Sequence, residues 1–339
     1  MNLRVSALLT AIVVASAGCG EDDPGGGKAG SGGGSSGSCK PSAESCYVAG
    51  AEGPGNECMA KADFSGSAVA QLRVASHQVK SPTTLAAPFM QNAIITKKSA
   101  LFEPTCNLDG TGQFNLLLTV DSGASTLTLA GGVPQALLGP ATAGTCYARL
   151  DAGGGIVVEP VTAPMTLGSD GQFTATFGSF VLPIYLEDSA DAEKAVLMPL
   201  HEMTVTGKLS ADHNCIGRYA HERGNPSQSC QPGEGQFAWE PAGRYEGYIT
   251  VTEADEVFVH SLGQTLCVVL TGDPTLWKGP KPDLNCKTSQ GFVDNGGLPK
   301  GDWCSTTNSA GGCQDSWRLV IDYAAQAIQI GGEYGSGCS

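Results

Sequence analysis

The sequence predicts a mainly β protein, a disulfide-braced antiparallel β-sandwich of the jelly-roll or Greek-key type. Short alternating blocks of Val, Thr, Ile and Phe predict strands. The 47 glycines supply turns, and charged residues, at 15%, are too few for long Lys/Glu helices. Many short strands without alternating helices are typical of packed antiparallel sheets rather than of a parallel sheet.

Residues 1–18 predict an export signal that is removed. Arg4 precedes an apolar run, Val5 to Ala15, and small residues follow up to Gly18. The run is too short for a membrane-spanning helix, which needs about 20 apolar residues. Ala15-Ser16-Ala17 also fits the cleavage site of an ordinary secreted protein, so simple secretion is an alternative to anchoring.

The stretch Ser16-Ala17-Gly18-Cys19 resembles the lipobox of bacterial envelope lipoproteins, with Ser16 in place of the usual leucine. The resemblance covers residues 1–20. It implies that Cys19 is acylated and becomes the N-terminus, so that the membrane is a partner through lipid. Because Gly20 replaces the aspartate that favours inner-membrane retention, the resemblance also implies the outer membrane of a two-membrane bacterium.

Cysteine parity agrees with a lipidated Cys19. The chain has 13 cysteines, an odd number, and Cys-x-x-Cys spacing typical of zinc sites is absent from the sequence. With Cys19 acylated, an even set remains for disulfides in an oxidising compartment. The predicted disulfide residues are Cys39, Cys46, Cys58, Cys106, Cys146, Cys215, Cys230, Cys267, Cys286, Cys304, Cys313 and Cys338.

The body after the anchor divides by composition. Residues 19–38 form the anchor and a Gly/Ser tether without large apolar side chains. A cysteine-rich segment follows at 39–61, and its odd number of cysteines predicts a bridge into the remaining chain. We expect a β-sandwich lobe at 62–209 and a disulfide-rich C-terminal lobe at 210–339. Residues 39–209 hold five cysteines and residues 210–339 hold seven, and because both numbers are odd we expect bridges to fix the two parts together.

Strand signals follow one another in the first lobe. They lie at 68–79, 92–102, 156–161, 172–177, 179–187, 195–200 and 203–209, with a hairpin at 114–132 that turns at 121–123.

In the second lobe, residues 252–272 form the one candidate helix, with Thr252 and Asp255 at its N-cap and Gly272 after its end. A strand pair is the alternative there, because β-branched residues and Gly263 interrupt the pattern. Residues 315–323 and 327–330 predict the final strands.

The histidines predict no catalytic site. His201-Glu202 and His221-Glu222 begin like the zinc-protease motif but lack its second histidine. His213 beside Asp212 could form an Asp/His pair, although a structural histidine is the commoner case. No catalytic residue is predicted.

Two binding sites are candidates. Asp188, Asp191 and Glu193 share one loop and could hold calcium, the one candidate cofactor; the alternative is a solvated acidic loop. Trp277 lies among turn-forming residues and could provide a sugar-binding face. Trp303 and Trp317 flank two cysteines, so we expect them to pack against a disulfide.

The net charge of the chain limits the classes of molecule that it can bind. The net charge of −14 opposes nucleic acid and anionic lipid surfaces, which it would repel. We therefore expect a non-catalytic, membrane-anchored lipoprotein acting in adhesion, ligand binding or envelope assembly, with a glycan or envelope protein as partner. The alternatives are a tethered hydrolase of extracellular polymers, whose paired carboxylates need not be close in sequence, and a carbohydrate- or calcium-binding module.

Overall fold

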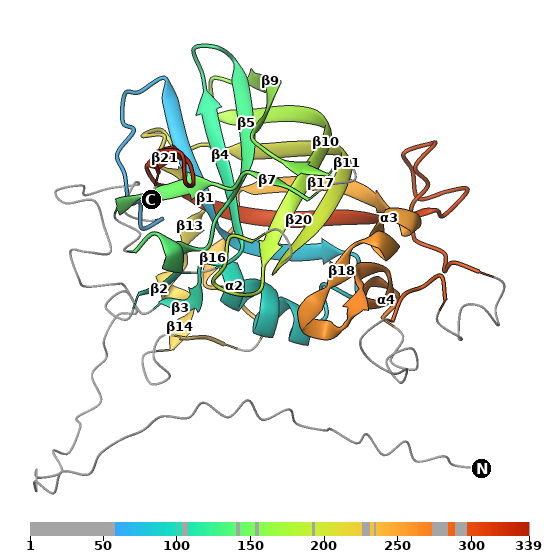
Figure 1. Ribbon diagram of the computed structural model, residues 1–339. Helices are drawn as coiled ribbons and strands as arrows, with labels where there is room; N and C mark the ends of the chain where they lie inside the picture. Colours follow the sequence, from blue (N-terminus) through green and yellow to red (C-terminus); the bar gives the residue numbers. More distant parts are fainter. Residues whose placement is uncertain are drawn as a thin grey trace, which may run out of the picture. The chain divides into compact units, whose positions relative to one another are not determined.

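The structure is a computed structural model that describes residues 58–99, 101–103, 108–139, 143–152, 156–191, 194–225, 231–233, 235–272, 284–288 and 297–338. The protein is mainly β, as predicted, and one large sheet dominates it (Figure 1). Eight of its strands, in spatial order, are β5 (Thr126–Gly132), β4 (Asn115–Asp121), β1 (Val69–Ser81), β20 (Ser316–Ala327), β17 (Gly243–Thr250), β11 (Ala195–Lys208), β10 (Gln172–Tyr185) and β9 (Val161–Leu167).

This sheet closes on itself. Besides β10, strand β9 pairs antiparallel with β5, in the register Thr126↔Pro164 to Leu129↔Val161. The eight strands of the described chain therefore form a ring of antiparallel neighbours. The predicted sandwich type, jelly roll or Greek key, is not confirmed, because strand alternation reveals which side chains face inward but not which strand edges meet.

Smaller elements flank the ring. The sheet also includes β6 (Thr145–Tyr147), β21 (Ile330–Glu333) and β12 (Cys215–Ile216), and β21 pairs with β6 in parallel. Short pairs are β2 (Leu101–Glu103) with β3 (Leu108–Thr111), β7 (Leu150–Asp151) with β8 (Val157–Val158), β13 (Arg218–Tyr219) with β16 (Trp239–Glu240), β14 (Gly224–Asn225) with β15 (Gln231–Pro232), and β18 (Phe258–Val259) with β19 (Gln264–Thr265). The helical segments are η2 (Phe89–Thr96), α2 (Lys97–Ser99), η4 (Gln135–Leu137), η7 (His221–Arg223), α3 (Val251–Glu256), η9 (His260–Leu262) and α4 (Leu266–Thr271).

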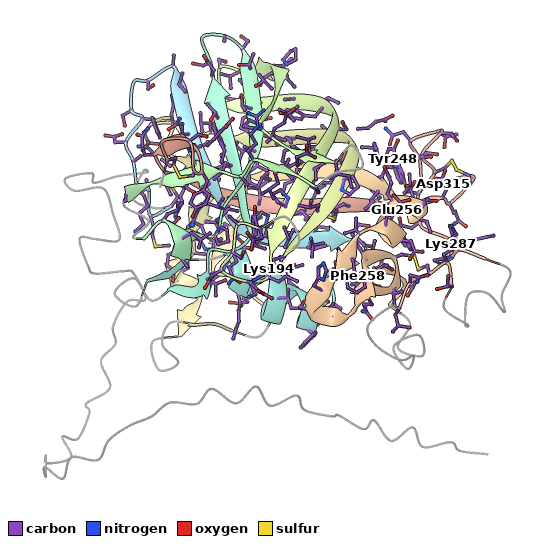
Figure 2. All side chains as sticks on the ribbon, viewed as in Figure 1. Lys194, Tyr248, Glu256, Phe258, Lys287 and Asp315 are labelled. Atoms are coloured by element: carbon purple, nitrogen blue, oxygen red, sulfur yellow. A yellow bond between two sulfur atoms is a disulfide. The ribbon has the colours of Figure 1, made fainter. Side chains whose placement is uncertain are left out.

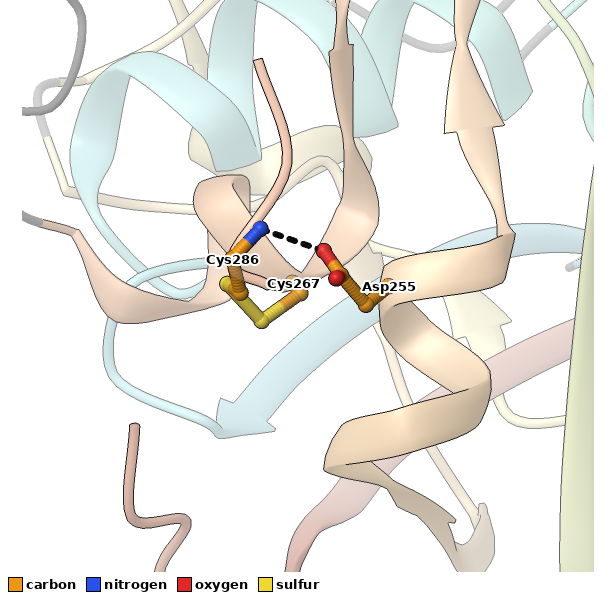
Figure 3. A group of neighbouring side chains, drawn as sticks. All are labelled: Asp255, Cys267 and Cys286. Carbon is orange, nitrogen blue, oxygen red and sulfur yellow. Dashed lines mark hydrogen bonds between the residues drawn. A yellow bond between two sulfur atoms is a disulfide. The ribbon is translucent and has the colours of Figure 1, made fainter. Parts of the chain in front are cut away.

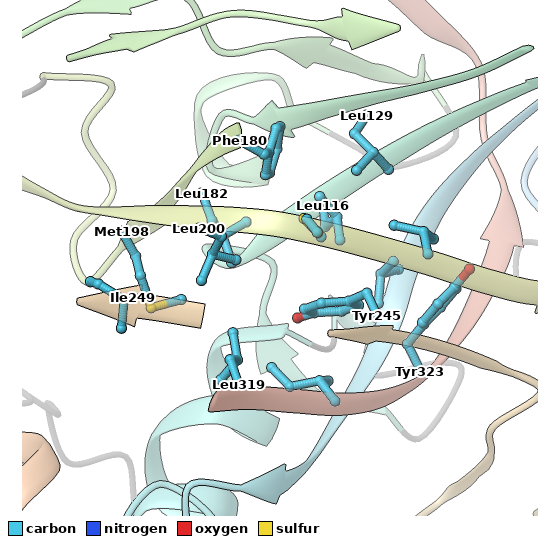
Figure 4. Close-up of a cluster of buried hydrophobic side chains, with 14 of the residues drawn as sticks. Leu116, Leu129, Phe180, Leu182, Met198, Leu200, Tyr245, Ile249, Leu319 and Tyr323 are labelled. Atoms are coloured by element: carbon cyan, nitrogen blue, oxygen red, sulfur yellow. The ribbon is translucent and has the colours of Figure 1, made fainter. Parts of the chain in front are cut away.

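The core fills the interior of the ring. Along β10 the residues alternate between exposed and buried, so that Phe173, Ala175 and Phe177 all face inward. Figure 4 shows side chains from several strands, including Phe180 and Leu319, gathered in this core. The predicted hairpin at 114–132 is confirmed as β4 and β5, paired from Asn115↔Gly132 to Asp121↔Thr126.

Strands from both sides of residue 210 share this sheet. β20 and β17 lie between β1 and β11, so residues before and after position 210 contribute to one core. Two disulfides also cross this position, Cys58–Cys215 and Cys146–Cys338. The first confirms the predicted bridge from the cysteine-rich segment, and the second attaches Cys338 to β6.

The candidate helix at 252–272 is two short helices separated by a hairpin. α3 ends before Val257, which is extended, and β18, η9 and β19 precede α4. Gly263 adopts a left-handed conformation at the turn, and Gly272 does so at the end of α4, where the stop was predicted. The predicted N-cap was wrong: Thr250 caps α3, with Glu253 completing the capping box.

The disulfides indicate the compartment. Within the described chain the pairs are Cys58–Cys215, Cys146–Cys338, Cys267–Cys286 and Cys304–Cys313. Four such bonds suggest an extracytoplasmic protein, because cytosolic thiols are kept reduced. Cys19, Cys39, Cys46, Cys106 and Cys230 lie outside the described residues. The described helices are all too short or too polar to cross a bilayer.

Candidate functional site

A β-bulge turns two polar residues of β11 toward the outside of the ring. His201 pairs with Tyr248 and Thr204 with Glu246, so β11 has one residue more than β17 across this interval. Leu200 and Met203 are both fully buried in the core. His201 and Glu202 between them are therefore both left on the outer face, and Glu202 has the unusual φ of 46°.

Gly247 of β17 accommodates the bulged strand. A Cβ atom at this position would lie 2.9 Å from the carbonyl oxygen of His201 and 3.4 Å from Cα of Met203. Because backbone atoms cannot move aside as a flexible side chain can, glycine is the residue that fits here.

A small cavity opens beside the bulge. It has a volume of about 240 Å³. We call it the β11–β17 pocket; its lining residues are Glu202, Thr204, Glu246, Gly247, Trp303, Asn308 and Arg318. Strands β11, β17 and β20 supply its floor, and the loop that precedes β20 supplies the tryptophan.

Several contacts fix the loop that carries Trp303. The backbone N–H of Trp303 donates to the carbonyl of Ser316, 2.9 Å away, and the reverse bond is 3.1 Å. The disulfide Cys304–Cys313 closes this loop directly after Trp303 in the sequence. The indole Nε1 donates to Oδ1 of Asn308 at 3.1 Å. The half-buried Trp303 ring is thus held against the pocket before any ligand arrives.

Arg318 joins the aromatic ring to a carboxylate. Its Nη2 donates to Oε2 of Glu246 at 2.8 Å, and its guanidinium lies 4.7 Å from the centre of the Trp303 ring. Both Glu246 and Arg318 are about one-third exposed, so the ion pair borders the cavity and is not sealed in the core. The contact of a guanidinium with an indole face is favourable in itself.

A histidine and a glutamate lie next to the pocket. His201 Nε2 is 2.7 Å from Oε1 of Glu253, and the His201 ring lies 5.4 Å from that of Tyr248. Oε2 of Glu253 accepts from the backbone N–H and the hydroxyl of Thr250. Burial would raise the pKa of Glu253, but the hydrogen bonds from Thr250 and His201 outweigh it and lower this pKa.

The surroundings of the pocket are negatively charged. Burial first, and then the charges of Glu202, Glu253 and Asp315, raise the pKa of Tyr248. Figure 2 shows Tyr248 and Asp315 on the same side of the molecule. The pKa of Asp315 is lowered by hydrogen bonds from Ser305, which keeps this carboxylate ionised.

The predicted calcium ligands have separate partners in the structure. Oδ1 of Asp188 accepts from Nε2 of Gln113 at 2.6 Å, and Oδ2 of Asp191 accepts from the hydroxyl of Ser189 at 2.9 Å. Glu193 lies outside the described residues. The described chain does not bring Asp188 and Asp191 into a group of three metal-ligating atoms.

Two groups of three potential ligands do occur among the described residues, and both contain a disulfide. Asp255 lies beside Cys267 and Cys286, and Asp315 beside Cys304 and Cys313. Figure 3 shows the first group, in which the two sulfurs are bonded to each other and Asp255 accepts from the backbone N–H of Cys286 at 2.5 Å. A sulfur in a disulfide is not the thiolate that binds metals, so both groups are structural.

The other predicted residues are placed as follows. Asp212 accepts from Ser210 and from the backbone N–H of Asn214, whereas His213 Nδ1 contacts the carbonyl of Ser67 at 2.9 Å. The Asp212–His213 pair is therefore not formed. Trp277 lies outside the described residues.

The residues of the β11–β17 pocket were missed by sequence reasoning. His201-Glu202 attracted attention only as an incomplete zinc motif, and Trp303 was expected to pack on its neighbouring disulfide. Glu246 follows the buried Tyr245 in β17, so strand alternation predicts that it faces outward. A signal was present in the polar pair His201-Glu202 between buried Leu200 and Met203, which breaks the period of two and indicates a bulge.

Comparisons with known proteins add no relative. No protein-family model matches the chain, and neither a curated protein nor a solved structure matches it. Any assignment of function therefore depends on the residues of the pocket and on the N-terminal sequence.

Proposed function

We propose that this protein is a lipid-anchored binding protein of the bacterial outer membrane, and that the β11–β17 pocket binds one sugar ring of an envelope or extracellular glycan. The observation that supports it most directly is the position of Trp303, held against a cavity that two carboxylates, an amide and a guanidinium also line.

A sugar matches this set of groups. Sugar hydroxyls both donate and accept, and the pocket offers carboxylate acceptors at Glu202 and Glu246 and donors at Arg318 and Asn308. The indole offers an apolar surface for the C–H face of the ring. The volume of about 240 Å³ is below the range of pockets that enclose drug-sized ligands, about 300–1,000 Å³, so one ring would enter and the rest of a glycan would extend over the surface.

A direct test is binding of short oligosaccharides to the full chain purified in detergent. Trp303→Ala should weaken binding about tenfold or more, because buried aromatic anchors dominate such contacts. The matched control is Phe89→Ala, which removes an aromatic ring that is 69% exposed and does not line the pocket. Equal affinity for the wild type and Trp303→Ala would contradict the assignment of the pocket.

The anchor has its own test, the intact mass of the mature chain extracted from membranes. The proposal expects a diacylglyceryl and acyl addition on Cys19 and the loss of 12 hydrogens for six disulfides among the remaining cysteines. A soluble mature chain with an unmodified Cys19 would exclude the lipid anchor and leave simple secretion.

Hydrolysis of a glycan is the second candidate function, because Glu202 and Glu246 line the same pocket from adjacent strands. Glycoside hydrolysis uses two carboxyl groups on either side of the bond that breaks. Against it, Glu246 is already held by Arg318. Release of reducing ends by the wild type but not by Glu202→Gln would favour the hydrolase.

A further inference from the structure

The carboxylates around the β11–β17 pocket differ in whether they have partners. Arg318 is engaged by Glu246, and His201 by Glu253. Within the described chain, no hydrogen bond or ion pair engages the carboxylate of Glu202, although it lines the cavity and is exposed. The one guanidinium that lines the pocket is therefore already paired, and Glu202 is an unpaired carboxylate at the ligand position.

Two further carboxylates add to this field. Oδ1 of Asp302 accepts from the backbone N–H of Arg318 at 2.9 Å, and Asp315 accepts from Ser305. Neither has a basic partner among the described ion pairs, and both flank the loop that carries Trp303. The negative charge at the pocket thus exceeds what Arg318 neutralises, and a ligand that carried phosphate, sulfate or a uronic acid would be repelled.

We propose that the pocket recognises an amino sugar, a hexosamine unit with a free, protonated amine, whose ammonium group pairs with Glu202 while its ring contacts Trp303. This inference rests on the proposed function and names the class of glycan. A metal cation would need three or more converging oxygen ligands, and no such group is found at this pocket among the described residues. An organic ammonium needs only one carboxylate and an apolar ring face.

Three oligosaccharides of equal length separate the outcomes when titrated onto the full chain in detergent. They are β-1,4-linked glucosamine, its N-acetylated form and a neutral glucose oligomer. We expect the glucosamine oligomer to bind about tenfold or more tightly than the other two, because hydrogen bonds to charged groups are the stronger kind. This preference should shrink as salt increases.

A variant locates the preference. Glu202→Gln should bind all three oligomers with similar affinity, and Glu187→Gln, an exposed carboxylate outside the pocket, should behave as the wild type. A preference that persists in Glu202→Gln would overturn the inference. Equal binding of the three oligomers by the wild type would overturn it while leaving the proposed function intact, whereas no binding of any oligomer would overturn both. The wild-type comparison and its salt dependence remain decisive if Glu202→Gln does not fold.

Discussion

At the residue scale, the least expected side chain is a histidine in the apolar core. His77 of β1 is fully buried, stacks on Phe114 with ring centres 4.0 Å apart, and contacts the hydroxyl of Tyr245 at 2.9 Å through Nδ1. Burial first, and then the charge of Arg73, lower the pKa of His77 to about 3. His77 is therefore neutral in the folded protein under conditions in which an unfolded chain would protonate it.

This difference predicts a pH dependence of stability. Below about pH 6.5 the unfolded state binds a proton that the folded state refuses until about pH 3, so the free energy of unfolding falls as pH falls through this window. The contribution is about 1.4 kcal/mol per pH unit. Denaturant titrations at several pH values should show this loss in the wild type and not in His77→Gln.

The exposed His260 provides the control. His260→Gln should retain the wild-type dependence, because His260 is exposed and lies outside the buried surroundings of His77. An unchanged pH dependence in His77→Gln would show that His77 does not carry the effect.

Thr250 gives a second prediction for a single residue. Its hydroxyl accepts from the backbone N–H of Glu253 at 3.2 Å and donates to the Glu253 carboxylate, which also holds His201. Thr250→Ala should cost about 1 kcal/mol of stability through loss of the N-cap. Thr252→Ala, in the first turn, should change stability by less than about 0.5 kcal/mol. The reverse order in thermal unfolding would contradict the observed N-cap.

At the element scale, the site depends on an irregularity in a long strand. A regular β11 would alternate without interruption and would turn either His201 or Glu202 into the core. Burial of either polar side chain in the apolar core would be unfavourable. The bulge places both His201 and Glu202 on the outer face of the sheet, beside β17. Glu202, which we propose contacts the ligand, thus lies where the strand departs from regular geometry, and bulges are often found next to functional sites.

Gly247→Ala tests this relation. The added methyl group would lie 2.9 Å from the His201 carbonyl, so β11 or β17 must shift, which should lower stability by about 1–3 kcal/mol and weaken ligand binding together. Gly178→Ala in β10 is the matched control, because its Cβ would meet nothing within 4 Å. It should leave the melting temperature unchanged or slightly higher. Equal effects of the two substitutions would argue against close approach at the bulge.

The sequence predicted where individual strands lie along the chain, but not which strands pair with one another in the sheet. Period-two alternation predicted β4, β5, β10 and β11, because inward side chains must be apolar wherever one face is buried. It could not predict that β9 pairs with β5 or that β21 pairs with β6, because edge pairing depends on three-dimensional placement. The same holds for the pocket, whose residues Glu202, Glu246 and Trp303 are up to about a hundred positions apart.

At the scale of the whole molecule, disulfides connect distant parts of the chain to one sheet. Cys146–Cys338 joins the segment after β5 to the C-terminus across 192 residues, and Cys304–Cys313 spans only nine. In the chain-entropy description, a bridge stabilises the fold by restricting the unfolded chain, and the effect increases with loop length. The two bridges should therefore contribute differently although their chemistry is the same.

The matched variants are Cys146→Ala with Cys338→Ala, and Cys304→Ala with Cys313→Ala. Loop-closure entropy gives about 5 kcal/mol for the long bridge and about 3 kcal/mol for the short one. Thermal unfolding of both double variants should show the larger loss for the long bridge, whereas ligand binding should suffer more from removal of the short one, which holds the Trp303 loop in place. If removal of the short bridge left binding unchanged, the Ser316 and Asn308 contacts alone would be enough to position Trp303.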